Sequence, residues 1–174
     1  MPIYRYTPAS NDFNTLERVS IRGDLYSKFV TNKKISSKWR PIKVRVDKHG
    51  HRGEFPSFEP AIPVFTQKAL NVLQPFLGDT IEALPLNCGR FKFYAIHVLN
   101  VVDCFDEKRS DFNRFPSGGI MYINKHVFKE KCLDQQLMFR ISQAPIWGVY
   151  YTERFKQLLD EANLKGLNHR KVFP

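Results

Sequence analysis

Four carboxylate side chains follow the most apolar stretch of the sequence, namely Asp103, Asp106, Glu107 and Asp111. Carboxylates three positions apart can share a proton or bind a divalent cation, as they do in many acid–base and metal sites. Lys108 and Arg109 lie among them, and no glycine-rich loop or second acidic cluster accompanies them. We therefore favour a polar turn at the end of a strand, and we predict no catalytic residue here.

Histidines and cysteines give equally weak signals for a site. His49-Gly50-His51 offers two imidazoles, but a third metal ligand is missing nearby and the surrounding basic residues repel cations. His97 lies inside an apolar strand, where we expect a hydrogen-bonded core histidine rather than a catalytic one. The three cysteines are odd in number and widely spaced, which suits a reducing cytosol. No metal, cofactor or nucleotide motif is predicted, and we do not expect an enzyme.

Positive charge is the strongest chemical signal of the chain. Its net charge is +10, and residues 28–52 hold nine Lys and Arg against Asp47 alone. Such a field speeds association with an acidic partner, although a solvated basic edge without a partner is the plain alternative. The candidate partner-binding residues are Lys33, Lys34, Lys38, Trp39, Arg40, Lys43, Arg45 and Lys48.

Nucleic acid is the other partner that residues 28–52 suggest. Phe29 and Trp39 are candidates for stacking on bases while the lysines follow the phosphates. No helix-turn-helix, RNA-recognition or zinc-finger pattern accompanies them. A nucleic-acid-binding module is therefore the alternative function, and nucleic acid is not the partner we favour.

The elements that must position these residues can be predicted from periodicity. The N-terminal third predicts a short strand over 3–6, short helices over 16–19 and 25–30, and a strand over 42–46 with Lys43 and Arg45 on one wet face. His49 to Gly53 is predicted to be a turn. A strand over 62–65 then leads to Thr66, which is a plausible N-cap.

Two later segments predict the same sequence of elements. In the first, Thr66 begins a helix with Ala69, Leu70, Leu73 and Phe76 facing inward, Pro75 ends or bends it, and strands follow over 81–86 and 91–102. The second runs from a strand over 149–151 through Thr152 to a helix with Phe155, Leu158, Leu159 and Ala162 on one face, then a strand up to Val172. Between them we predict a turn over 116–119 and a helix over 125–133.

These patterns indicate one α+β domain, with a mixed or antiparallel sheet and a few flanking helices. The repeated strand–helix–strand pattern is either an internal duplication or the common way to build such a unit. We expect residues 1–60 to form an irregular, basic segment packed on a core of residues 61–174. The start of the chain has no signal-like apolar region, and no stretch is long enough to span a bilayer.

The order of landmarks from Pro63 to Val172 resembles a bacterial immunity-protein family of polymorphic-toxin loci, the eleventh of the named immunity families and formerly a domain of unknown function. Trp39-x-Pro41 and Phe55-Pro56-Ser57 resemble its upstream segment, with Glu54 where an aspartate is expected, and residues 1–35 have no clear match. The matching positions in the core are Val64-Phe65-Thr66-x-Lys68-Ala69-Leu70, Phe76-Leu77-Gly78-Asp79, Tyr94 to Asp103, Asp106-x-x-Arg109-Ser110, Tyr122-Ile123, Phe139-Arg140, Tyr151-x-Glu153-Arg154-Phe155-Lys156 and Leu164-x-Gly166-Leu167.

The resemblance implies a protein that neutralises a cognate toxin or effector delivered by a neighbouring or sister bacterium, and it supplies no catalytic residues. It agrees with a cytoplasmic protein that binds its partner stoichiometrically, and a monomer is favoured. Inhibitors of nucleases usually imitate an acidic substrate, whereas this chain is basic. We therefore expect a toxin with an acidic docking surface.

Overall fold

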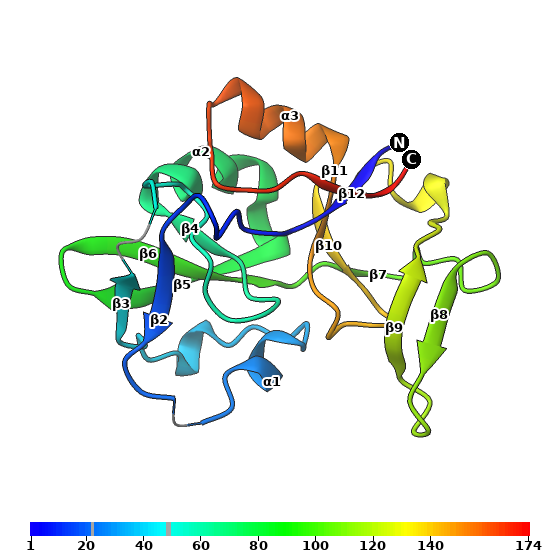
Figure 1. The fold of residues 1–174 in the computed structure, drawn as a ribbon, viewed down its shortest axis with the longest axis horizontal. Coiled ribbons are helices and arrows are strands. Elements are labelled where there is room, and N and C mark those ends of the chain that lie inside the picture. The colour runs from blue at the N-terminus through cyan, green and yellow to red at the C-terminus, as the bar shows by residue number, and fades with distance from the viewer. Residues whose placement is uncertain (22, 48–49) are drawn as a thin grey trace.

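A computed structural model describes residues 1–21, 23–47 and 50–174 of the protein, and Figure 1 shows an α+β fold. The helices are α1 (Tyr26–Phe29), α2 (Gln67–Leu77) and α3 (Glu153–Glu161), with single 3-10 turns at Ser36–Lys38, Gly78–Thr80 and Glu130–Cys132. The strands are β1 (Ile3–Arg5), β2 (Thr15–Arg18), β3 (Val44–Asp47), β4 (Val64–Thr66), β5 (Ile81–Cys88), β6 (Phe91–Val98), β7 (Val101–Val102), β8 (Asp111–Arg114), β9 (Ile120–Lys125), β10 (Met138–Ile141), β11 (Tyr150–Thr152) and β12 (Arg170–Phe173).

A three-stranded antiparallel sheet in the order β4-β6-β5 carries α2. The most apolar strand, β6, is its central strand, as we predicted, and it is buried from Ala95 to Val98. The Thr66 side chain accepts a hydrogen bond from the Ala69 amide (3.3 Å), so the predicted N-cap of α2 is confirmed. The helix continues past Pro75 and ends at Gly78, whose φ of 50° lies in the left-handed region.

A second sheet, in the order β12-β1-β11-β10-β7, carries α3. Thr152 begins the helix as predicted, but its hydroxyl donates to the Gln136 carbonyl (2.9 Å) instead of capping the helix. β1 lies between β12 and β11, and Ile3 pairs with both Phe173 and Thr152. Residues 1–60 therefore supply an inner strand to the sheet of the C-terminal part, besides the segment that packs on the core.

The two sheets have similar strand–helix–strand units. β4 and β5 are both antiparallel to β6, while β11 and β12 are both antiparallel to β1. In each unit, two parallel strands joined through a helix therefore flank one antiparallel strand. The inserted strand of the first unit, β6, follows that unit in the sequence, whereas the inserted strand of the second unit, β1, lies at the start of the chain. The sequence predicted the shared order of strand, helix and strand, and the structure shows that the likeness extends to the sheet topology.

Three local predictions are wrong, each because a contact between distant parts of the chain decides the structure. Residues 16–19 are mostly strand β2, which pairs with β3 and not with a helical neighbour. The stretch 125–133 contains an isolated bridge between Phe105 and Phe128 and one 3-10 turn. The predicted strand 91–102 is interrupted at Asn100, whose side chain donates to the Met138 carbonyl (3.0 Å), and its end becomes β7 in the second sheet.

Helices α2 and α3 pack against the sheets in one of three buried clusters, whereas Phe29 of α1 belongs to another. From α2, Ala69, Leu73 and Leu77 are buried as part of this cluster, while Leu70 is half-buried and Phe76 is 52% exposed. From α3, Phe155 and Leu159 are fully buried, and Leu158 and Ala162 are half-buried beside them. The predicted inward faces are therefore confirmed, except for Phe76, whose place Leu77 takes.

We predict that Phe155→Ala lowers the free energy of unfolding by about 3–5 kcal/mol, because the ring is fully enclosed and its removal leaves a cavity. Equilibrium unfolding in urea measures this loss. Phe76→Ala is the matched control, since its ring is exposed and the change should stay within about 0.5 kcal/mol. Equal losses in both variants would contradict the packing of α3.

Candidate functional site

The basic segment, defined here as residues 28–47, runs through α1, the Ser36–Lys38 turn and β3. The structure places every predicted lysine and arginine of this segment at the surface, and Lys48 lies outside the described residues. The exposed side chains are Lys33, Lys34, Lys38, Arg40, Lys43 and Arg45. Val44 between Lys43 and Arg45 is buried, which confirms the predicted wet face of β3. The sequence therefore identified the exposed cations correctly.

A buried carboxylate on β5 holds the middle of the basic segment. The Ile35 amide donates to Glu82 Oε2 (2.8 Å), and the Ser36 amide donates to Glu82 Oε1 (3.1 Å). Burial acts to raise the pKa of Glu82, but these hydrogen bonds and one with His97 outweigh it and lower the pKa below its ordinary value. The carboxylate is therefore ionised at neutral pH and fixes two backbone amides of the segment.

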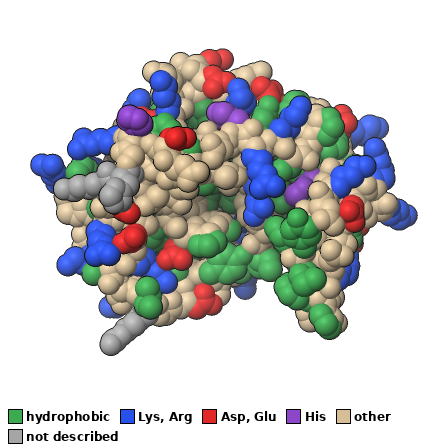
Figure 2. Space-filling model, in the orientation of Figure 1, with side chains coloured by type: hydrophobic (Ala, Val, Ile, Leu, Met, Phe, Trp, Pro, Cys, Tyr) green, Lys and Arg blue, Asp and Glu red, His purple; other side chains and the backbone are tan. Residues whose placement is uncertain are grey.

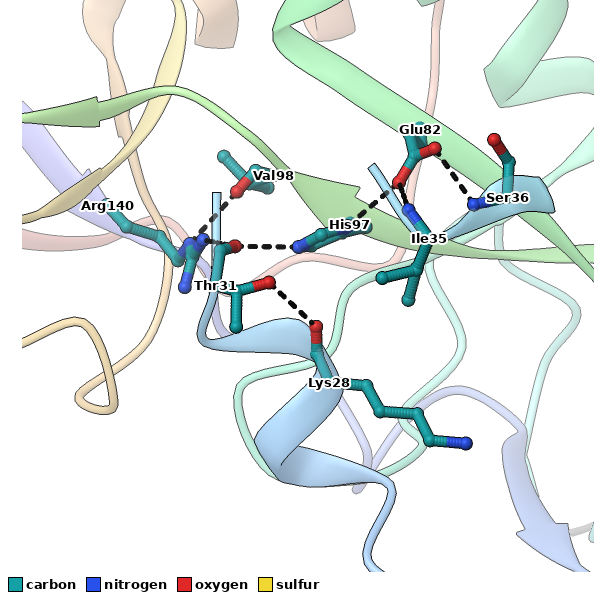
Figure 3. Close-up of polar contacts among 8 residues, drawn as sticks. All are labelled: Lys28, Thr31, Ile35, Ser36, Glu82, His97, Val98 and Arg140. Atoms are coloured by element: carbon teal, nitrogen blue, oxygen red, sulfur yellow. Dashed lines mark hydrogen bonds and ion pairs between the residues drawn. The ribbon is translucent and has the colours of Figure 1, made fainter. Parts of the chain in front are cut away.

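The neighbouring side chain is His97 on β6, which is fully buried (Figure 3). Its Nδ1 lies 3.0 Å from Glu82 Oε2, and its Nε2 lies 2.8 Å from the Thr31 carbonyl oxygen. Both ring nitrogens thus lie within hydrogen-bonding distance of oxygen atoms on other elements. The predicted core histidine is therefore present, with a structural partner on each side.

Arg140 on β10 completes this buried network. Its Nε donates to the Val98 carbonyl (3.0 Å), and its Nη2 donates to the Thr31 carbonyl (2.5 Å), as Figure 3 shows. Its Nη1 is buried without a hydrogen-bond partner within the described part of the chain. Burial lowers the pKa of Arg140 to about 10, which still leaves it charged at neutral pH. Two side-chain donors from different strands therefore converge on one carbonyl oxygen of the basic segment.

The aromatic residues of the segment belong to its packing. Phe29 is 4% exposed, and its ring meets the Trp39 ring edge-on at 5.9 Å. Trp39 is half-buried, and its indole N–H donates to the Pro85 carbonyl (2.8 Å). Trp39 was a predicted partner-binding residue, but its contacts anchor the segment to β5. Phe29 is too deeply buried to stack on a base.

Ion pairing leaves part of the positive charge uncompensated. Lys34 lies 3.5 Å from Asp79, and Arg45 Nη2 lies 2.8 Å from Glu17. Among residues 1–21, 23–47 and 50–174, no ion pair is formed by the remaining cations of the predicted set, which are Lys33, Lys38, Arg40 and Lys43. These side chains are available to a partner.

The turn of the β5–β6 hairpin adds further cations that the sequence did not single out. The backbone of Lys43, just before β3, forms an isolated β-bridge with Asn87 near the end of β5. This bridge brings β3 beside the hairpin turn. Arg90 and Lys92 flank Phe91 there, and Figure 2 shows Lys and Arg side chains gathered at the end of the molecule where Figure 1 places the hairpin turn. The only local sequence signal was the alternation Arg-Phe-Lys next to a glycine.

The acidic residues after β6 do not form a joint site. Asp103 pairs with Lys129 (3.6 Å), and Glu107 pairs with Arg114. Asp106 accepts hydrogen bonds from the backbone amides of the turn that follows it. No group of three or more His, Cys, Asp or Glu could hold a metal ion in the portion of the chain that the structure describes. His49 of the predicted histidine pair lies outside that portion.

Two of the cysteines come together in space. A disulfide bond joins Cys104 to Cys132 with their Cα atoms 5.8 Å apart, and Cys88 is a buried free thiol. The two cysteines lie far apart in the sequence, so their proximity could not be predicted from spacing. The β8–β9 hairpin brings the chain after β9 back beside the chain before β8. The sequence predicted no pairing of the cysteines, and the structure pairs Cys104 with Cys132.

Comparison with known proteins finds no family model and no curated protein that match this chain. Across the described ranges, no helix is both long enough and apolar enough to cross a membrane.

We predict that Glu82→Ala lowers the free energy of unfolding by about 3 kcal/mol or more, because it leaves His97 and two backbone amides without their buried acceptor. Urea unfolding measures the loss, and amide hydrogen exchange at Ile35 and Ser36 should become faster. Glu17→Ala is the control, since it removes an exposed ion pair with Arg45 and should cost at most about 1 kcal/mol.

The lowered pKa of Glu82 also predicts how stability changes with pH. Because the folded-state pKa of Glu82 is lowered, its contribution is complete above the unfolded value of 4.5 and is lost as pH falls through the folded value. The difference in free energy of unfolding between wild type and Glu82→Gln should therefore shrink as the pH falls below 4.5 and through the folded-state pKa of Glu82. A difference that stays constant into strong acid would show that the ionised carboxylate is not the stabilising form.

Proposed function

We propose that this protein binds and neutralises a toxin protein that has an acidic face, in a one-to-one complex in the cytoplasm. The main observation behind this proposal is a cluster of exposed cations without ion-pair partners among the described residues. They lie on the basic segment, which the buried network of Glu82, His97 and Arg140 fixes to the sheets. Long-range attraction by such charges raises the rate of encounter. The proposal assigns no chemical step and no cofactor to the chain.

Rigidity of the basic segment favours a protein partner. Contacts from β5, β6 and β10 fix the backbone at Thr31, Ile35 and Ser36, so less conformational entropy is lost when a partner binds. Figure 3 shows the side chain of Lys28 pointing away from these contacts. Cations presented in a fixed arrangement suit a defined acidic surface on a folded toxin.

The resemblance to immunity proteins supports this proposal through the core. His97 and Arg140 both fall within landmarks that carry the resemblance, and both hold the basic segment in place. The landmark residues Thr66, Phe155 and Gly166 likewise serve the fold, because Thr66 caps α2, Phe155 is buried and Gly166 has a φ of 121°. We infer that the shared pattern specifies a scaffold, while the exposed cations select the toxin.

We predict that purified protein abolishes the activity of its toxin at one molecule per toxin molecule, without any added cofactor. The toxin to use is the one encoded beside its gene, and the measurement is a titration of toxin activity in the presence and absence of a chelator. Neutralisation far below equimolar amounts, or neutralisation that the chelator abolishes, would show that the protein does not act as a simple binding inhibitor.

We predict that reversing Lys33, Lys38 and Lys43 to Glu slows association with the toxin at least several-fold at low salt, with a smaller gap at high salt. Stopped-flow or biosensor kinetics measure both rates. The matched control reverses Lys108, Lys125 and Lys131, which are equally exposed, form no ion pair with described residues, and lie outside the basic segment. Equal slowing in both variants would assign the effect to net charge alone.

A further inference from the structure

A cavity of about 670 Å³ lies beside the basic segment, at the turn of the β5–β6 hairpin. Its walls come from β3, from Gly50, Arg52 and Gly53, from the start of α2 and from the start of β6. The size is within the range of sites for small organic ligands. The residues that bear on its chemistry are Arg52, Lys68, Arg90, Phe91, Lys92 and Phe93. The proposed binding of a toxin does not rely on these six side chains.

The cavity is positively charged. Among the described residues that line it are four cations, and of these only Lys68 has a described carboxylate partner, Glu54 at 3.2 Å. Arg52, Arg90 and Lys92 form no ion pair with any residue that the structure describes. The α2 helix also begins at this wall, and the N-terminal end of a helix adds partial positive charge. A ligand of this cavity should therefore carry negative charge, and guanidinium groups favour phosphate oxygens.

An aromatic surface accompanies these charges. Phe91 is 36% exposed, and the guanidinium carbons of Arg52 and Arg90 lie 5.7 Å and 5.2 Å from the centre of its ring. The Phe93 ring lies behind it, with centres 6.2 Å apart and planes tilted by 32°. Aromatic rings and guanidinium planes are the groups on which unpaired bases stack. The walls thus combine a flat apolar surface with phosphate-binding groups.

We propose that this cavity binds a nucleotide, with its phosphates held by Arg52, Arg90 and Lys92 and its base stacked at Phe91. The inference does not depend on toxin binding, because Arg52, Arg90, Phe91 and Lys92 are not among the residues that carry the proposed function. The nucleotide is either a free mononucleotide or one unit of a single strand, since both present the same base and phosphate. Phe91 provides the aromatic surface that the buried Phe29 cannot provide.

Calorimetric titration of the full chain at about 0.15 M salt tests the site with ATP and with inorganic tripolyphosphate. Phe91→Leu should weaken ATP binding about tenfold and tripolyphosphate binding much less, because it removes the stacking surface while all the phosphate-binding cations remain. Arg90→Gln combined with Lys92→Gln should weaken both probes at least tenfold. Lys125→Gln, an exposed lysine on β9, should change neither, and thermal melting confirms that each variant is folded.

A second titration compares AMP with a short single-stranded oligonucleotide of the same base. Much tighter binding of the oligonucleotide, lost in Phe91→Leu, assigns the site to a strand, whereas equal binding assigns it to the free nucleotide. Wild-type affinity for tripolyphosphate equal to that for ATP would overturn the proposal in favour of a simple anion site. Absence of ATP binding at millimolar concentration, or ATP binding that Phe91→Leu leaves unchanged, would also overturn it.

Discussion

Side chains from strands of two different sheets meet at one backbone carbonyl of the basic segment, that of Thr31. Within the sheets, each strand is held by a ladder of hydrogen bonds, whereas residues 31–36 are tied to the sheets by side chains of β5, β6 and β10. His97 and Arg140 donate to the Thr31 oxygen from two different strands, and Glu82 accepts from the amides of Ile35 and Ser36. Buried charges are costly unless paired and hydrogen-bonded, so the network holds its shape only when its members are all present.

This arrangement also links the two halves of the molecule. β6 and β10 belong to different sheets, yet their side chains meet at the same oxygen atom. The chain passes from β6 into β7 with only Leu99 and Asn100 between them, and both amides donate to the Thr80 carbonyl. The two sheets are therefore connected by a short covalent link and by a polar contact under the basic segment. A change at either place should affect the presentation of the surface lysines.

Signals contained in neighbouring residues could be predicted from the sequence. The Thr66 cap, the turn at 116–119, the wet face of β3 and the central place of β6 follow from residue type and spacing alone. The segment 16–19 could not be predicted, because Leu16 lies in a strand only through its pairing with Val46. Thr152 shows the same limit, since a distant carbonyl takes the hydroxyl that a local rule assigns to the helix.

The candidate site likewise contains features that could be predicted from local sequence and others that depend on distant contacts. Exposed cations could be identified from composition, whereas the sequence left Trp39 open between a partner anchor and a core residue, and its contacts with Pro85 and Phe29 are visible only in the structure. The three members of the buried network come from positions 82, 97 and 140, and their proximity depends on the pairing of β5 with β6 and on the crossing between sheets. The same is true of Arg52 and Arg90, which meet only at the ring of Phe91.

The disulfide between Cys104 and Cys132 turns the β8–β9 hairpin into a closed covalent ring. A protease that cuts the exposed turn at Pro116–Gly119 would leave one molecule with two chain segments, which separate only after reduction. A reducing cytosol opens the ring, and the hairpin is then retained by the packing of Phe105 against Phe128 and by their backbone bridge. The hairpin can thus exist in two forms that have the same fold but differ in how firmly its base is tethered.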